Sequence, residues 1–146
     1  MVEKYPIPAN ENERLDALKT YQILDSAPEQ EYDAITRLAS YICQAPMAMI
    51  TLIDHDRQWL KSKVGIDIAE TPRADAFCRY TILNDHSLEV PDTRADERFL
   101  DNKFVKGEPG IRFYAGSPLV DEDGHRLGAL CVVDYVPRKL TPEQLD

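Results

Sequence analysis

The side chains best suited to covalent chemistry in this chain are three cysteines, at positions 43, 78 and 131. An odd number at such wide spacing does not form a disulfide framework, so the composition favours a reducing cytoplasm. Cys43 falls in an apolar helical stripe and Cys131 in an apolar strand, where thiols are usually inert. Of the three, only Cys78 is expected to lie near a pocket. Cysteine chemistry would therefore centre on Cys78, and packing is the alternative reading for all three residues.

Other catalytic patterns are missing from the sequence. His55, His86 and His125 stand singly, without a partner four residues away or a cysteine at metal-ligand spacing. The acidic turns 54–56 and 121–123 lack the spaced ligands of a calcium loop. The glycines fit neither a dinucleotide motif nor a phosphate loop, and Ser117 lacks the nucleophile-elbow pattern. The sequence thus predicts no catalytic residue, no metal site and no required cofactor.

Size and charge narrow the class of protein further. The 146 residues suffice for one domain, with 43% hydrophobic and 29% charged residues. The formal charge of −9 would repel a phosphate backbone, so a nucleic-acid partner is not expected. No apolar run approaches the roughly 20 residues that span a bilayer, and the start does not resemble a signal peptide. We expect a cytoplasmic protein without membrane insertion.

The elements that must position any site begin with the stretch 111–135. Two apolar runs there flank the turn 121–124, which predicts the central hairpin of a sheet. Alternation in the first run leaves one face mainly apolar, and the second run is apolar on both faces. Gly128 would allow a close approach of another group, and a bulge is the alternative.

Helices and further strands precede this hairpin. Asn10 is expected to cap a helix that carries Leu15 and Leu18, and Ser26 to cap a second helix that ends at Cys43. The second helix has an apolar stripe, expected to lie against the sheet, made of Tyr32, Ile35, Leu38, Ala39 and Ile42. Strands are predicted at 47–53, 58–64 and 88–90.

The segment 66–84 is predicted to be a loop followed by one helix, and the segment 92–110 a short helix and a long ordered loop that covers the sheet. Candidate ligand-binding residues lie on these segments or on the non-core face of the strand that follows. They are Phe77, Cys78, Tyr80, Arg94, Phe99, Arg112 and Tyr114. Their alternative is plain packing, because aromatic residues dominate protein cores.

Several spaced motifs together resemble a GAF domain over about residues 12–146. They are ILDSAPE at 23–29, DRQWLKS at 56–62, ETPR at 70–73, AFC at 76–78, RFYAG at 112–116 and LGALCVVD at 127–134. The resemblance is to the subgroup near the N-terminus of bacterial sensor kinases and diguanylate cyclases. It implies an α+β fold with a central antiparallel sheet of five or six strands. Helices would cover one face, and loops and short helices would cover a ligand pocket on the other.

This resemblance sets the expected organisation and function. Residues 1–11 would be a flexible leader, 12–140 the GAF domain, and 141–146 the start of a helix leading to an output domain. The domain would be non-enzymatic, bind a small ligand or a partner, and signal to a histidine kinase or diguanylate cyclase. A homodimer is expected, with Leu15 and Leu18 as candidate dimer-face residues.

Four alternatives stay open at this point. A ligand-free dimerisation spacer would need the same fold. Bilin-binding GAF domains attach their chromophore through a cysteine near the position of Cys78, but a histidine usually follows it and here Arg79 does. Asn102-Lys103-Phe104 matches only the start of a cyclic-nucleotide signature. Methionine sulfoxide reductases of the GAF fold use several cysteines, and the positions of Cys43 and Cys131 argue against that activity.

Overall fold

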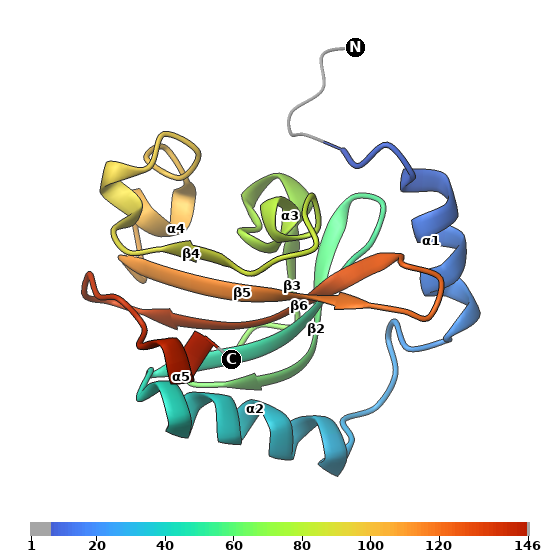
Figure 1. Cartoon of the computed structure of the whole chain (residues 1–146), viewed down its shortest axis with the longest axis horizontal. Coiled ribbons are helices and arrows are strands. Elements are labelled where there is room, and N and C mark those ends of the chain that lie inside the picture. Colours follow the sequence, from blue (N-terminus) through green and yellow to red (C-terminus); the bar gives the residue numbers. More distant parts are fainter. Residues whose placement is uncertain (1–6, 146) are drawn as a thin grey trace.

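The computed structural model describes residues 7–145 and contains one six-stranded antiparallel sheet (Figure 1). The strand order is β3-β2-β1-β6-β5-β4. The strands are β1 Met47–Ile53, β2 Arg57–Val64, β3 Glu70–Pro72, β4 Leu88–Val90, β5 Phe113–Val120 and β6 Arg126–Asp134. This architecture confirms the predicted α+β class. Of the predicted leader, residues 1–6 lie outside the described part of the chain.

Two hairpins form the middle of the sheet. The predicted central hairpin is β5–β6, and it pairs through β6 with β1 of the β1–β2 hairpin. All residues of β1 are buried, because both faces of this strand are covered. At Gly128 in β6, an added Cβ would lie 1.8 Å from the carbonyl oxygen of Thr51 in β1. The close approach expected at this glycine is therefore present, and its partner is backbone.

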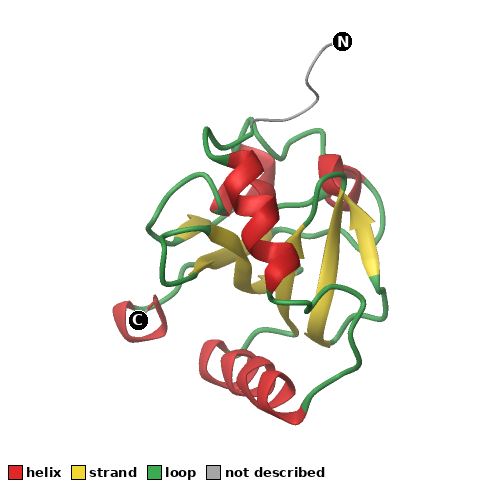
Figure 2. Ribbon diagram, turned by 90° about the vertical axis from the view of Figure 1, so that its right-hand side faces the viewer, coloured by secondary structure: helices red, strands yellow, loops and turns green. Residues whose placement is uncertain are grey.

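The helices cover the sheet unequally. The elements are α1 Glu11–Thr20, α2 Gln30–Cys43, α3 Cys78–Thr81, α4 Lys103–Lys106 and α5 Pro142–Leu145, with 3-10 turns η1 Arg73–Asp75 and η2 Thr93–Ala95. Helices α2 and α5 lie on one side of the sheet, and α3 and α4 on the other (Figure 1). Figure 2, seen from the α1 end, shows α1 in front of the sheet and α2 beneath it. The larger apolar core lies between the sheet and the α3 and α4 segments.

Helix α2 departs from the prediction in two ways. It begins at Gln30 rather than after Ser26, because the Ser26 hydroxyl donates to the carbonyl of Ile23 and accepts from Lys61 Nζ at 2.6 Å. Its expected sheet-facing stripe is largely exposed, at 47% for Ile35, 56% for Leu38 and 48% for Ile42. The prediction that this stripe packs on the sheet is therefore wrong for these three residues, whereas Ala39 does pack against the apolar cluster of sheet residues.

Other α2 residues make the contact with the sheet. Thr36 is fully buried and donates to Ser62 Oγ in β2 at 2.7 Å, and Cys43 packs in an apolar cluster with residues of the sheet. Periodicity alone identified an apolar face, but it could not show that a polar contact through Thr36 sets the orientation of the helix.

Helix α1 is fixed to the end of the sheet by buried groups. Leu18 is 1% exposed and packs with Leu52 and Trp59. Arg14 is fully buried and donates to the carbonyl of Ile53 at 2.7 Å. Leu18, named above as a dimer-face candidate, is thus occupied within its own chain and cannot face a second subunit, while Leu15 is half-buried. Within the described residues, no helix has the length and apolar character needed to cross a membrane.

Candidate functional site

A cavity of about 330 Å³ lies between the sheet and the segments that carry α3 and α4. Most of its wall is apolar, which suits a compact organic ligand. Strands β1, β2, β5 and β6 form the floor, and the segments 66–78 and 104–111 form the cover. The lining residues are Met49, Gln58, Ile66, Ile68, Thr71, Asp75, Ala76, Phe77, Cys78, Phe104, Glu108, Pro109, Ile111, Tyr114, Cys131 and Val133.

One polar group of the cavity wall has no partner. Gln58 is 7% exposed, and its buried Oε1 accepts no hydrogen bond from any described residue. An unpaired buried acceptor costs free energy that a ligand donor would recover. The charged lining residues are both acidic, Asp75 and Glu108, and no lysine or arginine appears among the described lining residues. The wall therefore offers an acceptor and negative charge, but nothing to pair with a phosphate.

Aromatic rings form one side of the cavity. The Phe77 ring lies 4.7 Å from that of Phe99 and 5.4 Å from that of Tyr114, measured between centroids. Tyr80 meets Phe99 edge-on at 5.2 Å. These contacts pack the rings against one another, so this side of the wall is held in place by aromatic packing within the chain.

Two buried thiols adjoin these rings. Cys78 Sγ and Cys131 Sγ are 3.8 Å apart, and Tyr114 Oη donates to Cys78 Sγ at 3.1 Å. The Tyr114 hydroxyl also contacts Thr81 Oγ1 at 2.6 Å. Burial opposes ionisation of Cys78, but hydrogen bonds from Cys131, Thr51 and Tyr114 outweigh it and lower the pKa of the Cys78 thiol. The interaction with Cys78, together with burial, raises the pKa of Cys131 well above its ordinary value.

The cover is tied together and to α1 by polar contacts. Asn102 Nδ2 donates to the carbonyl of Asp75 at 3.0 Å, which joins the two covering segments. Arg73 in η1 is fully buried and pairs with Glu11 of α1 at 2.5 Å. Glu11 also pairs with Arg14 at 2.9 Å. The wall of the cavity is thus linked directly to the N-terminal helix.

The structure brings three of the seven predicted site residues to the cavity, namely Phe77, Cys78 and Tyr114. Phe99 and Tyr80 support the wall from behind. The remaining two do not line it. Arg94 is exposed and pairs with Asp92, and the Arg112 guanidinium donates to the carbonyl of Val105 at 2.8 Å.

Sequence reasoning missed the contributions of the central strands, above all Gln58 and Cys131. Both lie within strands that the sequence located correctly. The face on which each side chain lies depends on register, and β2 shifts register opposite Ile50 and Thr51. A polar Gln58 inside a predicted strand was the one available signal.

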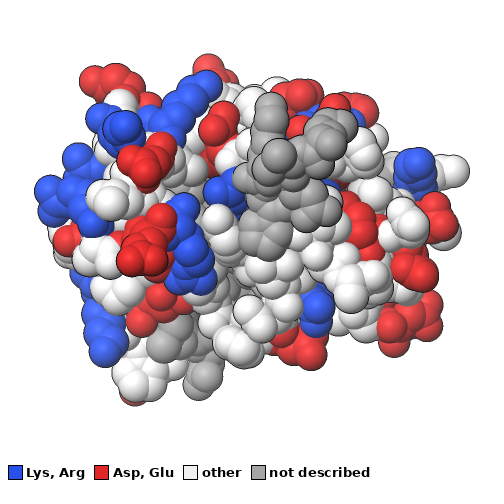
Figure 3. Space-filling view, turned by 90° about the horizontal axis from the view of Figure 1, so that it is seen from above, with Lys and Arg blue, Asp and Glu red and all other residues white. Residues whose placement is uncertain are grey.

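The outer face of the cover carries both signs of charge. Figure 3 shows lysines and arginines gathered over the α4 end, with acidic side chains among them. Several of these cations are paired, Arg94 with Asp92, Arg98 with Asp96 and Lys106 with Asp101. The basic groups therefore lie on the surface and not in the cavity.

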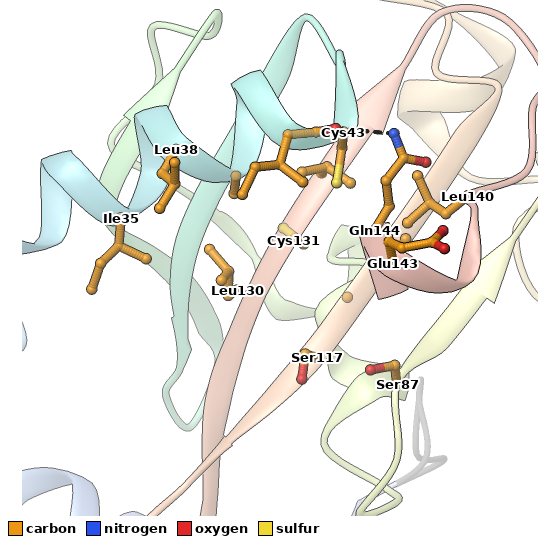
Figure 4. A pocket seen from close by; sticks show the side chains of 15 residues that line it. Ile35, Leu38, Cys43, Ser87, Ser117, Leu130, Cys131, Leu140, Glu143 and Gln144 are labelled. Atoms are coloured by element: carbon orange, nitrogen blue, oxygen red, sulfur yellow. Dashed lines mark hydrogen bonds between the residues drawn. The ribbon is translucent and has the colours of Figure 1, made fainter. Parts of the chain in front are cut away.

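A second hollow, the α2 groove, lies on the opposite face of the sheet (Figure 4). It measures about 290 Å³ and runs between α2, α5 and strands β5 and β6. Ile35, Leu38 and Ile42 border it and are each about half exposed. Gln144 of α5 donates to the carbonyl of Ile42 at 3.0 Å, the dashed line in Figure 4. The groove is open and apolar, which is typical of a contact surface.

A six-stranded antiparallel sheet with a long helix on one face and a covered cavity on the other is the architecture of GAF domains. The family model of the GAF domain matches residues 27–146, so the chain belongs to this family. The family resemblance inferred from the motifs is confirmed.

One characterised protein is similar to this chain over most of its length. A cyclic di-GMP phosphodiesterase of Pseudomonas aeruginosa is 43% identical over 133 residues, which is 91% of this chain and 23% of that protein. The chain therefore spans about a quarter of that relative's length.

Among solved structures, the GAF domain of a phosphoenolpyruvate-protein phosphotransferase from Coxiella burnetii is similar with a TM-score of 0.66 and 14% identity. The alignment covers 92% of this chain and 83% of that one. A free methionine-R-sulfoxide reductase from Thermoplasma acidophilum is similar with a TM-score of 0.63 and 15% identity. That alignment covers 87% of this chain and 84% of the reductase chain. At this level of identity, the two comparisons show similarity of fold alone.

Proposed function

We propose that this GAF domain is the sensory input module of a signalling protein and binds a small molecule in the cavity. The observation that carries the proposal is an apolar cavity of about 330 Å³ with a buried acceptor, Gln58 Oε1, that has no hydrogen-bond partner among the described residues. A ligand-free spacer would gain stability by filling that space and satisfying that oxygen.

The chemistry of the wall defines the class of ligand. Its apolar lining selects a compact hydrophobic or aromatic molecule, and Gln58 Oε1 selects one with an N–H or O–H donor. Asp75 and Glu108 favour a neutral or cationic molecule over an anion. A cyclic nucleotide therefore fits poorly, because its phosphate would find no cation in this wall.

The signal would leave through the terminal helices to an output domain of a longer, cytoplasmic protein. The 43% identity to part of a cyclic di-GMP phosphodiesterase supports an output that controls cyclic di-GMP, and a histidine kinase or diguanylate cyclase is the other output expected from the motifs. We further propose a homodimer formed through the α2 groove, since half-exposed apolar side chains on α2 provide the contact surface that Leu18 cannot.

Native mass spectrometry of protein purified from its own host tests the ligand. The wild-type chain is expected to carry a non-covalent small-molecule mass. Ala76→Leu, which adds volume to the cavity wall, should remove that mass, whereas Ala39→Leu adds the same volume at the α2 groove and should retain it. Near-ultraviolet circular dichroism confirms that both variants are folded. Wild-type protein free of any bound mass would contradict the sensor and favour the spacer.

Sedimentation velocity tests the dimer. Leu38→Asp places a charge on an apolar side chain that is 56% exposed, and should weaken self-association by about tenfold or more without lowering the melting temperature. Leu100→Asp is the matched control, because Leu100 is 48% exposed but lies outside the α2 groove. Equal dissociation constants for the two variants would exclude α2 from the interface.

A further inference from the structure

Cys78 and Cys131 form a pair that the fold places together from distant parts of the chain. Cys78 begins α3, and Cys131 lies in the middle of β6. Their sulfur atoms are 3.8 Å apart, which is close to van der Waals contact. Both residues are free thiols, 2% and 1% exposed, and both line the cavity. The cavity therefore gives a small oxidant a route to both sulfur atoms, and Cys131 also borders the α2 groove on the opposite face of the sheet.

The two thiols have different surroundings. Cys78 Sγ accepts a hydrogen bond from Tyr114 Oη at 3.1 Å, and the Tyr114 hydroxyl is itself fixed by Thr81. These contacts stabilise the thiolate of Cys78 and lower its pKa, while Cys131 is held as the neutral thiol. A stabilised thiolate beside a neutral thiol is the arrangement in which one sulfur attacks and the other resolves.

We propose that Cys78 and Cys131 are a reversible oxidation site for a small hydroperoxide that enters through the cavity. The Cys78 thiolate attacks the peroxide O–O bond, takes one oxygen as a sulfenic acid, and releases water from hydrogen peroxide or an alcohol from an organic hydroperoxide. Cys131 then attacks the sulfenic sulfur, and a disulfide forms with loss of one water. A dithiol reductant returns both thiols.

The geometry requires little movement for this step. A disulfide has a sulfur–sulfur distance of about 2.05 Å, so the two atoms must approach by roughly 1.8 Å from their present 3.8 Å. An uncharged peroxide suits a wall that is apolar and acidic. The bond would fasten α3 to β6 across one end of the cavity. This site goes beyond the proposed ligand sensing, since it needs no stably bound ligand.

Cys43 provides an internal comparison. It is 6% exposed, lies on the α2 side of the sheet, and packs in a separate apolar cluster. Burial raises the pKa of its thiol, and although Cys43 and Cys131 both border the α2 groove, Cys43 belongs to a different apolar cluster from Cys78 and Cys131. Cys43 should therefore react slowly with peroxide. Its replacement should leave the oxidation of Cys78 and Cys131 unchanged.

The test is a hydrogen peroxide titration of the reduced chain, followed by alkylation under denaturing conditions and intact-mass measurement. We expect two of the three thiols to be lost together, with a Cys78–Cys131 link in the peptide map, and both to return with dithiothreitol. Cys43→Ser should oxidise at the wild-type rate. Cys78→Ser and Cys78→Ala should each slow oxidation by about tenfold or more, and two substitutions guard against a misfolded variant.

Two further variants separate the roles of the residues. Cys131→Ser should stop at a sulfenic acid on Cys78, which dimedone traps as a mass adduct. Tyr114→Phe should slow the first step, because Cys78 loses a hydrogen-bond donor. Three independent thiols that oxidise at similar rates would overturn the proposal. Wild-type kinetics in folded Cys78→Ala would also overturn it, as would a cross-link through Cys43.

Discussion

Replacing Glu11 with glutamine is expected to lower the free energy of unfolding by about 3 kcal/mol or more, because it removes a carboxylate between two buried cations. Arg14 and Arg73 are both fully buried, and Glu11, 15% exposed, pairs with each of them. Urea denaturation at pH 7 measures the loss. Glu13→Gln is the matched control, since Glu13 lies in the same helical turn but is exposed, and it should change stability by less than about 0.5 kcal/mol.

The same carboxylate predicts a pH dependence. Burial alone would raise the pKa of Glu11, but hydrogen bonds and charges from Arg73 and Arg14 lower it below its ordinary value of 4.5. A lowered folded pKa means that the stabilisation is complete above pH 4.5 and is lost as the pH falls below it. Between pH 7 and pH 3 the wild-type chain should lose more stability than Glu11→Gln. Parallel pH profiles for the two proteins would contradict this account.

Gly128→Ala is expected to cost about 3 kcal/mol, since the new methyl group would overlap the backbone of β1. The added Cβ would lie 1.8 Å from Thr51 O and 2.7 Å from its carbonyl carbon. Neither atom can move without breaking the pairing of β1 with β6. Thermal or urea unfolding provides the measurement.

Gly107→Ala is the control for this substitution. Its Cβ would meet only the Lys103 carbonyl oxygen at 3.4 Å, which is ordinary contact, and its φ of −115° is open to any residue. We expect a change within about 0.5 kcal/mol for this variant. Equal losses for the two alanine variants would show that the strand contact at Gly128 is not the cause.

The sequence predicted the β5–β6 hairpin well because a turn signal and two apolar runs specify it locally. It placed Phe77, Cys78 and Tyr114 at the cavity for a similar reason, since they lie on predicted covering elements or the adjoining strand. The other contacts of the cavity depend on how strands distant in the sequence pair with one another. Cys131 reaches Cys78 only through the strand order, which local patterns do not encode.

The charged residues were the hardest to interpret from sequence. Arg14 and Arg73 are fully buried, whereas Arg94 and Arg112, chosen as ligand contacts, are used in local polar contacts. An isolated arginine in a sequence gives no sign of whether it will be buried or will lie at the surface, because the partner that permits burial lies elsewhere in the chain. For Arg73 that partner is Glu11, 62 residues earlier.

The link between Glu11 and Arg73 also gives the domain a reciprocal mechanical connection. Arg73 and Asp75 belong to the same short turn, η1, so one end of it holds α1 while the other lines the cavity. Any molecule that shifts η1 must strain the attachment of α1. If the proposed ligand changes the position of α1 through η1, thermodynamic linkage requires that a change at α1 alters the affinity for that ligand. The contact between Glu11 and Arg73 would then be the route by which the proposed ligand and α1 affect each other.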